Sequence, residues 1–228
     1  MSFKEFAREL NKDGPEGEVV KTVFVSLISS FMLFALFYYV KFRYISDFIP
    51  KYGFFVFLSI LSYAIILPTA RYISTYKEFP CMSGMMIGMT IGMVSGFLPG
   101  FVIGATNGMF YGSVFGMAVG ILFGAWNGKC CGIMGVMEGV MAGFMGGLMG
   151  AMSSVMMLND HLKIISIIVF IISTVILFGL TYMIYKEVKQ MQKSPEQRDV
   201  FFTIFWSILL TLITLLVIVF GPRSFIFQ

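Results

Sequence analysis

The residues of this sequence whose type and spacing suit chemistry are methionines, and they are concentrated in one segment. Residues 81–157 contain 15 methionines and 3 leucines, whereas the rest of the 228-residue chain contains 4 methionines and 16 leucines. Thioethers are soft, uncharged ligands, so two or three at helical spacing can hold Cu(I) in preference to hard cations. The methionines at such spacing are Met85, Met89, Met93, Met134, Met137, Met141, Met145 and Met149. The alternative is that unbranched methionine fills the irregular grooves over glycines better than leucine does.

Three cysteines offer stronger soft ligands. Cys81 opens one predicted span, and the adjacent Cys130 and Cys131 open another on the same, cytoplasmic side. An odd number that includes an adjacent pair argues against a disulfide framework and favours reduced thiols or metal ligands. Three thiols at the cytoplasmic ends of these spans would accept Cu(I) from the thioethers. Adjacent cysteines point apart on a helix, however, so both could bind one ion only if the turn is distorted. The alternative is that they serve as small apolar residues.

Glu138 is the one acidic residue predicted to lie inside a span. A carboxyl group within the hydrocarbon region is a candidate for relaying a proton or cation, so Glu138 is our candidate coupling group. The alternatives are that it is neutral and hydrogen-bonded to Asn127 or to nearby backbone, or that it pairs with Lys129.

The helices that must position these groups are marked by glycine. From Gly84 to Gly132 a glycine falls on every fourth residue, thirteen in unbroken register. Glycine costs about 1 kcal/mol relative to alanine in a water-exposed helix, whereas in a membrane small residues four apart let helix backbones approach closely. Each four-residue step rotates by about 40°, so one helix can present glycine to two neighbours. The glycines chosen for this packing role are Gly112, Gly116, Gly120, Gly139 and Gly143.

The composition is that of an integral membrane protein, with 58% hydrophobic residues, 12% charged residues and a mean hydropathy of +0.88. Apolar runs of roughly 20 residues predict an all-α, polytopic transmembrane helical bundle of about seven spans with a tightly packed Gly/Met-rich three-helix centre. The predicted spans are 19–40, 54–70, 82–103, 109–126, 131–157, 162–185 and 200–220. They divide one membrane domain into an amphipathic cytoplasmic segment (1–18), a two-span hairpin (19–80), a three-span region (81–158) and a second two-span hairpin (159–228).

Two turns are needed inside the central region, unless it forms two spans rather than three. They are predicted at 105–108 and 127–129, where Asn-Gly supplies residues with positive φ, and 98–100 is an alternative for the first. A straight helix over the 48 steps of the glycine register would be about 70 Å long, so the register must pass through a turn. Helix packing alone does not predict that the glycine register continues through a turn. We therefore hypothesise that this segment arose by amplification of a tetrapeptide unit.

The distribution of charge predicts topology and excludes some functions. With seven spans, 11 Lys and Arg residues fall on the side of the N-terminus and 5 on the other, which predicts a cytoplasmic N-terminus and an external C-terminus in a prokaryotic inner or plasma membrane. The basic residues lie in short patches between apolar runs, so no nucleic-acid partner is expected. No nucleophile-and-base set or phosphate-binding loop is recognisable, so we expect no enzyme.

Two of these motifs together resemble the copper transporter (Ctr) family. The residues are Met85, Met89 and Met93, followed by Gly112, Gly116 and Gly120. Members of that family combine an MxxxM motif on one span with a GxxxG motif on the next. The resemblance implies that the first methionine series, or Met137, Met141 and Met145, would coordinate copper, and that the glycines would allow close packing in an oligomer.

The sequence therefore supports two functional hypotheses. The first is a membrane protein that binds or conducts Cu(I) through methionine thioethers and cytoplasmic-side thiolates, with Cu(I) as its one expected cofactor. The second is a non-catalytic structural or assembly subunit of a membrane complex, whose glycine faces dock partner helices or copies of itself. The lipid bilayer is a partner in both, and we expect a homo-oligomer or a larger complex.

Overall fold

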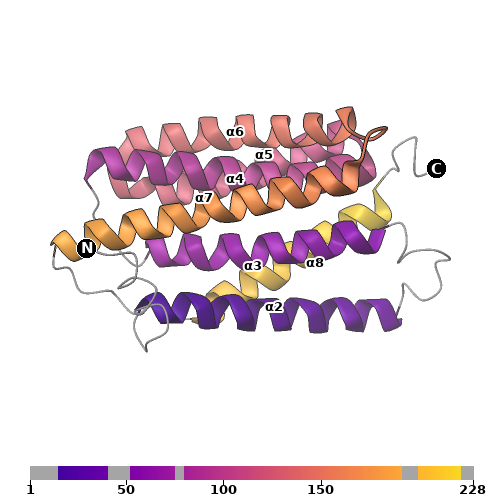
Figure 1. The fold of residues 1–228 in the computed structure, drawn as a ribbon, viewed down its shortest axis with the longest axis horizontal. Helices are drawn as coiled ribbons and strands as arrows, with labels where there is room; N and C mark the ends of the chain where they lie inside the picture. The colour runs from indigo at the N-terminus through magenta and orange to yellow at the C-terminus, as the bar shows by residue number, and fades with distance from the viewer. Residues whose placement is uncertain (1–14, 41–51, 75–79, 192–199, 222–228) are drawn as a thin grey trace.

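Seven α-helices run side by side along the long axis of the molecule (Figure 1). The computed structural model describes residues 15–40, 52–74, 80–191 and 200–221. The helices are α2 (Pro15–Val40), α3 (Phe54–Ser74), α4 (Cys81–Asn107), α5 (Met109–Gly128), α6 (Gly132–Met156), α7 (Leu162–Met191) and α8 (Val200–Phe220), with a 3₁₀ turn η3 (Lys129–Cys131). Consecutive helices are antiparallel, so the start of α2 and the end of α8 lie at opposite ends of the bundle. Which end is cytoplasmic stays a prediction.

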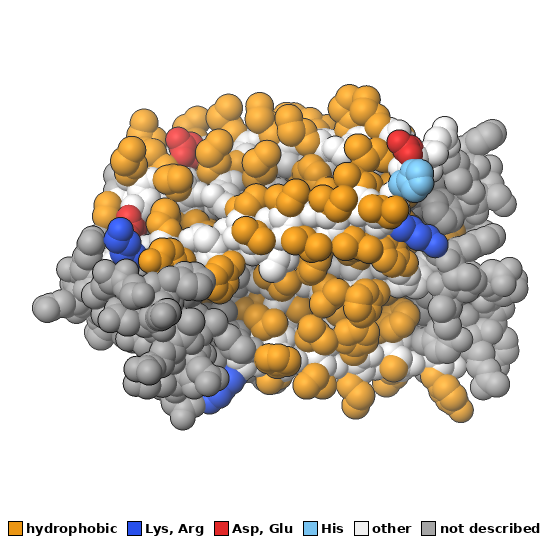
Figure 2. Space-filling model, in the orientation of Figure 1, with side chains coloured by type: hydrophobic (Ala, Val, Ile, Leu, Met, Phe, Trp, Pro, Cys, Tyr) orange, Lys and Arg blue, Asp and Glu red, His pale blue; other side chains and the backbone are white. Residues whose placement is uncertain are grey.

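The dimensions of these helices match a bilayer. Six of them, α3 to α8, are long and apolar enough to cross a membrane, and α2 carries a shorter apolar stretch over Lys21–Leu36. Figure 2 shows hydrophobic side chains over much of the described part of the visible face. The prediction of an all-α transmembrane bundle with three central helices is confirmed. Residues 1–14 of the predicted amphipathic segment lie outside the described residues.

The central helices α4, α5 and α6 meet through glycine on all three sides. Each layer of this cluster takes one glycine from each helix, and successive layers are one helical turn apart. The layers are Gly88, Gly128 and Gly135; Gly92, Gly124 and Gly139; Gly96, Gly120 and Gly143; and Gly100, Gly116 and Gly147. A Cβ atom on Gly120 would lie 2.8 Å from the Gly143 carbonyl oxygen and 2.8 Å from the Gly96 Cα. The three backbones therefore touch directly.

The antiparallel pairing of α4 with α5 explains why the glycine register survives the first turn. Gly104 faces Gly112 and Gly100 faces Gly116, so the centre of the hairpin is Gly108, whose φ is +98°. A hairpin pairs residues that are equally distant from its centre, and a glycine at the centre extends one register along both arms. Packing thus gives a physical reason for the persistence, and the proposed amplification stays an untested hypothesis.

The second turn differs from the prediction. Gly128 has a φ of −70° and still belongs to α5, and the chain reverses through η3 and then Gly132, whose φ is +70°. Because Gly128 faces Gly135, the centre of this hairpin falls between residues 131 and 132. The glycines of α6 that pair with α5 are therefore not in the four-residue register that ends at Gly132, but one residue before it, at Gly135, Gly139, Gly143 and Gly147. The alternative first turn at 98–100 is wrong, since Pro99 lies inside α4.

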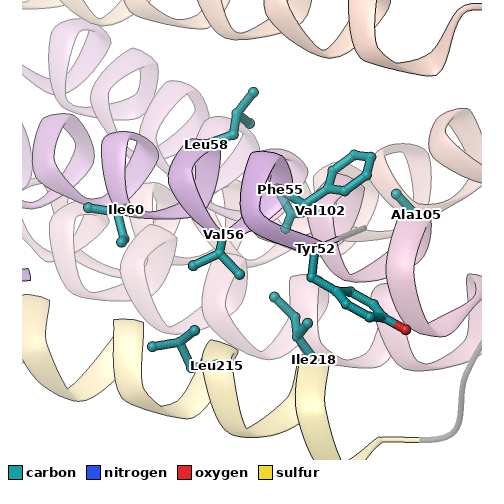
Figure 3. Packing of buried hydrophobic residues seen from close by; sticks show 9 residues of the cluster. All are labelled: Tyr52, Phe55, Val56, Leu58, Ile60, Val102, Ala105, Leu215 and Ile218. Atoms are coloured by element: carbon teal, nitrogen blue, oxygen red, sulfur yellow. The ribbon is translucent and has the colours of Figure 1, made fainter. Parts of the chain in front are cut away.

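Another face of α4 carries large buried apolar side chains, which pack on α3, α7 and α8. Ile87 and Ile91 pack with Leu180 and Ile184 of α7. Near the other end, a cluster joins α3, α4 and α8 (Figure 3), comprising Tyr52, Phe55, Val56, Leu58, Ile60, Val102, Ala105, Leu215 and Ile218. α4 therefore packs on α3, α5, α6, α7 and α8, whereas α2 packs on α3 and α8.

The glycine layers predict a clear contrast between two substitutions. Gly120→Ala forces a Cβ against backbone on two sides, so we expect the free energy of unfolding to fall by about 2 kcal/mol. Gly179→Ala is the matched control, because a Cβ there meets nothing within 4 Å, and its higher helix propensity should leave the protein equally or slightly more stable. Thermal unfolding in detergent measures both; equal midpoints would contradict the direct backbone contact.

Candidate functional site

Because the glycines face inward, the larger side chains of α6 face outward. The exposed methionines of this helix are Met134, Met137, Met141, Met145, Met149, Met152 and Met156. Together with the half-buried Glu138 they form what we call the methionine face of α6. Within the described part of the chain, α6 packs extensively on α4, α5 and η3 alone. The methionine face is therefore left uncovered.

The predicted ligands on α4 border this face. Met89 and Met93 are exposed, whereas Met85 is half-buried. Gly146 of α6 packs against the backbone of Met93, so the two methionine series lie next to one another on the outer surface. The structure thus places the thioethers around the central cluster and not along a path between its helices.

This placement limits what the thioethers can do within one chain. Methionines one turn apart have Cβ atoms about 5–6 Å from each other, so two flexible side chains can reach one ion from the same side. Further ligands would have to come from outside the chain. Among the described residues, no three His, Cys, Asp or Glu side chains gather in a way that could hold a metal ion.

The backbone brings the three predicted thiol positions to one end of the bundle. Cys81 is the first residue of α4, and Cys130 and Cys131 belong to η3, which packs on α4. The side chains of Cys81 and Cys131 lie outside the described residues. Cys130 is half-buried; its thiol donates a hydrogen bond to the Asn127 carbonyl oxygen (3.2 Å), and it packs against the apolar cluster that includes Ile87. Its described role is packing at the end of the central cluster.

Glu138 has no hydrogen bond or ion pair within the described part of the chain. It lies six residues into α6, about 9 Å along a helix of about 37 Å. With α6 centred on a hydrocarbon core of about 30 Å, its Cα lies roughly 5 Å inside the core. A carboxyl group inside the hydrocarbon region is costly to leave facing lipid, and the cost on insertion scales reaches about 2.5–3.5 kcal/mol at the centre of a span.

The two partners considered for Glu138 are not its partners in the structure. Asn127 is buried and its Nδ2 donates to the Phe123 carbonyl oxygen (3.0 Å), while its Oδ1 is buried without a partner. Lys129 is exposed and forms no ion pair with Glu138. Glu138 therefore belongs to the outer surface and Asn127 to the interior.

One polar contact ties α7 to the same end of the bundle. Ser83, in the first turn of α4, donates a hydrogen bond to the Glu187 carboxylate of α7. A carboxylate near a helix N-terminus is stabilised by the helix dipole, so the contact anchors α7 to the start of α4.

A seam of buried hydroxyls between α2 and α8 was missed in the sequence. Ser26 and Ser207 hydroxyl oxygens lie 2.7 Å apart, and Ser30 lies 3.4 Å from Ser207. The available signal was the four-residue spacing of Thr22, Ser26 and Ser30 in the first span and of Thr203, Ser207 and Thr211 in the last. Small polar residues at this spacing join helices in membranes, so the seam holds the first and last spans together.

Comparison with known proteins adds no analogy: no family model, no curated protein and no solved structure matches this chain. Its function must be argued from the residues themselves.

The hydroxyl seam predicts an energetic coupling between α2 and α8. In a double-mutant cycle, Ser26→Ala and Ser207→Ala should show a coupling energy of about 0.6 kcal/mol, the average for interhelical hydrogen bonds in a membrane protein. Ser29→Ala is the control, because its hydroxyl donates to the Ser26 carbonyl of its own helix and should show no coupling to Ser207. Unfolding of the four variants in detergent gives the cycle; additive effects of Ser26 and Ser207 would exclude the coupling.

Proposed function

We propose that this protein is a non-enzymatic subunit of a membrane assembly and that it docks through the methionine face of α6. The observation that carries the proposal is a difference between two equally exposed helices. The exposed side chains of α7 include Ile164, Ile167, Ile168, Ile171, Ile172 and Val175. Those of α6 are mostly methionines, together with Ile133 and Phe144, and the half-buried Glu138 lies among them.

The composition of the α7 face is what lipid contact requires, since branched aliphatic side chains are stiff and apolar. Methionine is flexible and adapts to irregular surfaces, which is why it recurs at binding surfaces that must accommodate a partner. A carboxyl group facing lipid is costly, whereas a partner helix can supply a hydrogen bond. Both features of α6 favour a protein neighbour over lipid.

The docking surface differs from the one that the glycine spacing suggested. Gly112 contacts α4 of its own chain, Gly116 and Gly120 contact α4 and α6, and Gly139 and Gly143 contact α5. These glycines leave no face for a partner within the described structure. In our proposal the methionine face is the docking surface instead, because the glycines of α6 face the central cluster and its methionines face outward.

Site-specific photocrosslinking tests the docking surface. A diazirine-bearing residue in place of Met141, 60% exposed, should form a protein adduct in native membranes. The matched control is Val175 of α7, 64% exposed, which should react with lipid and give no protein adduct. Equal absence of protein adducts from both positions would refute the proposal.

Cu(I) binding is a second candidate, favoured by the row of Met137, Met141, Met145 and Met149. These thioethers occupy successive turns on one uncovered face, so neighbouring pairs can approach one ion without burying net charge. The likeness of the motifs to the Ctr family supports the same chemistry. An apposed methionine face would complete the coordination, so this function is compatible with assembly.

Replacing methionine by leucine separates the two candidates. The triple variant Met137→Leu, Met141→Leu, Met145→Leu should lose most bound Cu(I), measured on the purified protein by titration against a Cu(I) chelator, because the apolar volume is kept and the thioether removed. Met32→Leu, an exposed position of α2, is the control. Unchanged copper stoichiometry in the triple variant would exclude the methionine face as a copper site.

A further inference from the structure

We infer that Met85 and Met89 of α4 bind one Cu(I) ion in the groove between α4 and α6, and that the Glu138 carboxylate of α6 neutralises the charge of this ion. The inference rests on the candidate function of Cu(I) binding and names the tightest site for it. It also gives a role to the one acidic residue of α6, which has no hydrogen bond or ion pair within the described part of the chain.

α4 and α6 run in the same direction and pack along two facing rows of residues. Gly146 of α6 packs against the backbone of Met93 of α4. One turn further along both helices, Gly150 packs against the backbone of Phe97. Each row therefore advances by four residues per step, which is the spacing that keeps side chains on one face of a helix.

The same two rows extend towards the start of both helices. Before its glycines the α6 row contains Glu138 and Ala142, and the α4 row contains Met85 and Met89. Ala142 is 6% exposed, as contact with α4 requires. Continuing the pairing by one and two turns sets Ala142 opposite Met89 and Glu138 opposite Met85. The carboxyl group thus comes from α6 and the two thioethers, one turn apart, come from α4.

The groove covers the two residues that stand opposite each other. Met85 and Glu138 are half-buried, whereas Met89 is 54% and Met141 is 60% exposed. A charged group that faces lipid is costly, and partial cover by the two helices lowers that cost. Among the thioethers that border α6, those beside Glu138 are therefore the best placed to hold an ion.

The charges on the neighbouring elements support the role of Glu138. Thioethers are uncharged, so a bound Cu(I) ion keeps its positive charge and needs an anion nearby within a membrane. The elements packed against α6 are α4, α5 and η3. The sequences of α4 and α5 contain no charged residue, and η3 contains only Lys129, which is exposed and nine positions from Glu138. Glu138 is thus the anion that these elements offer.

The experiment uses the full-length purified protein and Ag(I), a soft cation with the charge of Cu(I) that does not change its oxidation state. Its affinity is measured by competition with a chelator. Glu138→Gln should weaken the tightest site at least tenfold, because the amide keeps the size and removes the charge. Glu138→Asp keeps the charge and should stay close to wild type. The double variant Met85→Leu, Met89→Leu should lose the site, because it keeps the apolar volume and removes both thioethers.

The matched control is Met32→Leu of α2, an exposed methionine far from the groove in sequence, which should leave the affinity unchanged. The triple leucine variant of α6 should retain this one tight ion while it loses the others. Thermal unfolding of each variant shows that the comparison is made between folded proteins.

Each result decides for or against the site. Wild-type protein that binds no Ag(I) would overturn both Cu(I) binding and this inference. A Glu138→Gln affinity equal to that of wild type, or equal weakening by Gln and Asp, would overturn the neutralising role of the carboxylate and leave Cu(I) binding intact. A tight ion that survives in the double variant would overturn its placement at Met85 and Met89.

Discussion

Where α4, α5 and α6 meet, backbone atoms lie so near that one added Cβ would collide with two helices at once. Helices in lipid gain little from burying apolar side chains, so dispersion between closely packed backbones is what holds such a cluster together. That approach leaves no room inside for larger groups. α4 directs its branched apolar side chains, such as Ile87 and Ile91, to the outer helices, while α6 directs its methionines outward. The exposure of the thioethers is thus a consequence of the glycine cluster.

The helices α2 and α8 are held together in a different way from the central helices α4, α5 and α6. α2 and α8 run in the same general direction and are joined by hydroxyl groups, with the Ser26 and Ser207 hydroxyl oxygens 2.7 Å apart. α3 lies between the two halves and is largely buried, packing on α2, α4, α7 and α8. The protein therefore combines backbone contact in the central region with hydrogen bonding between its first and last spans.

The helices could be read from the sequence because bilayer thickness fixes their length: the span expected at 200–220 is α8, and that expected at 109–126 is α5 extended by two residues. The glycines were correctly expected to serve two neighbours. The outward position of Met141 and Glu138 could not be read, because a four-residue spacing shows which residues share a face and not what that face contacts. The seam of Ser26 with Ser207 joins residues 181 positions apart, and only the tertiary structure sets that pairing.

The second hairpin pairs Gly128 with Gly135, so its centre falls between residues 131 and 132. This pairing limits where residues can be inserted or deleted. Adding or removing one residue within α5 would rotate everything beyond it by about 100° and bring side chains where α4 and α6 now meet glycine. The geometry therefore constrains the length of the chain between Gly84 and Gly150, and we expect variation in length to fall in the segments that join the outer helices. In related chains, alignments should be free of gaps over this stretch even where the apolar residues themselves have diverged.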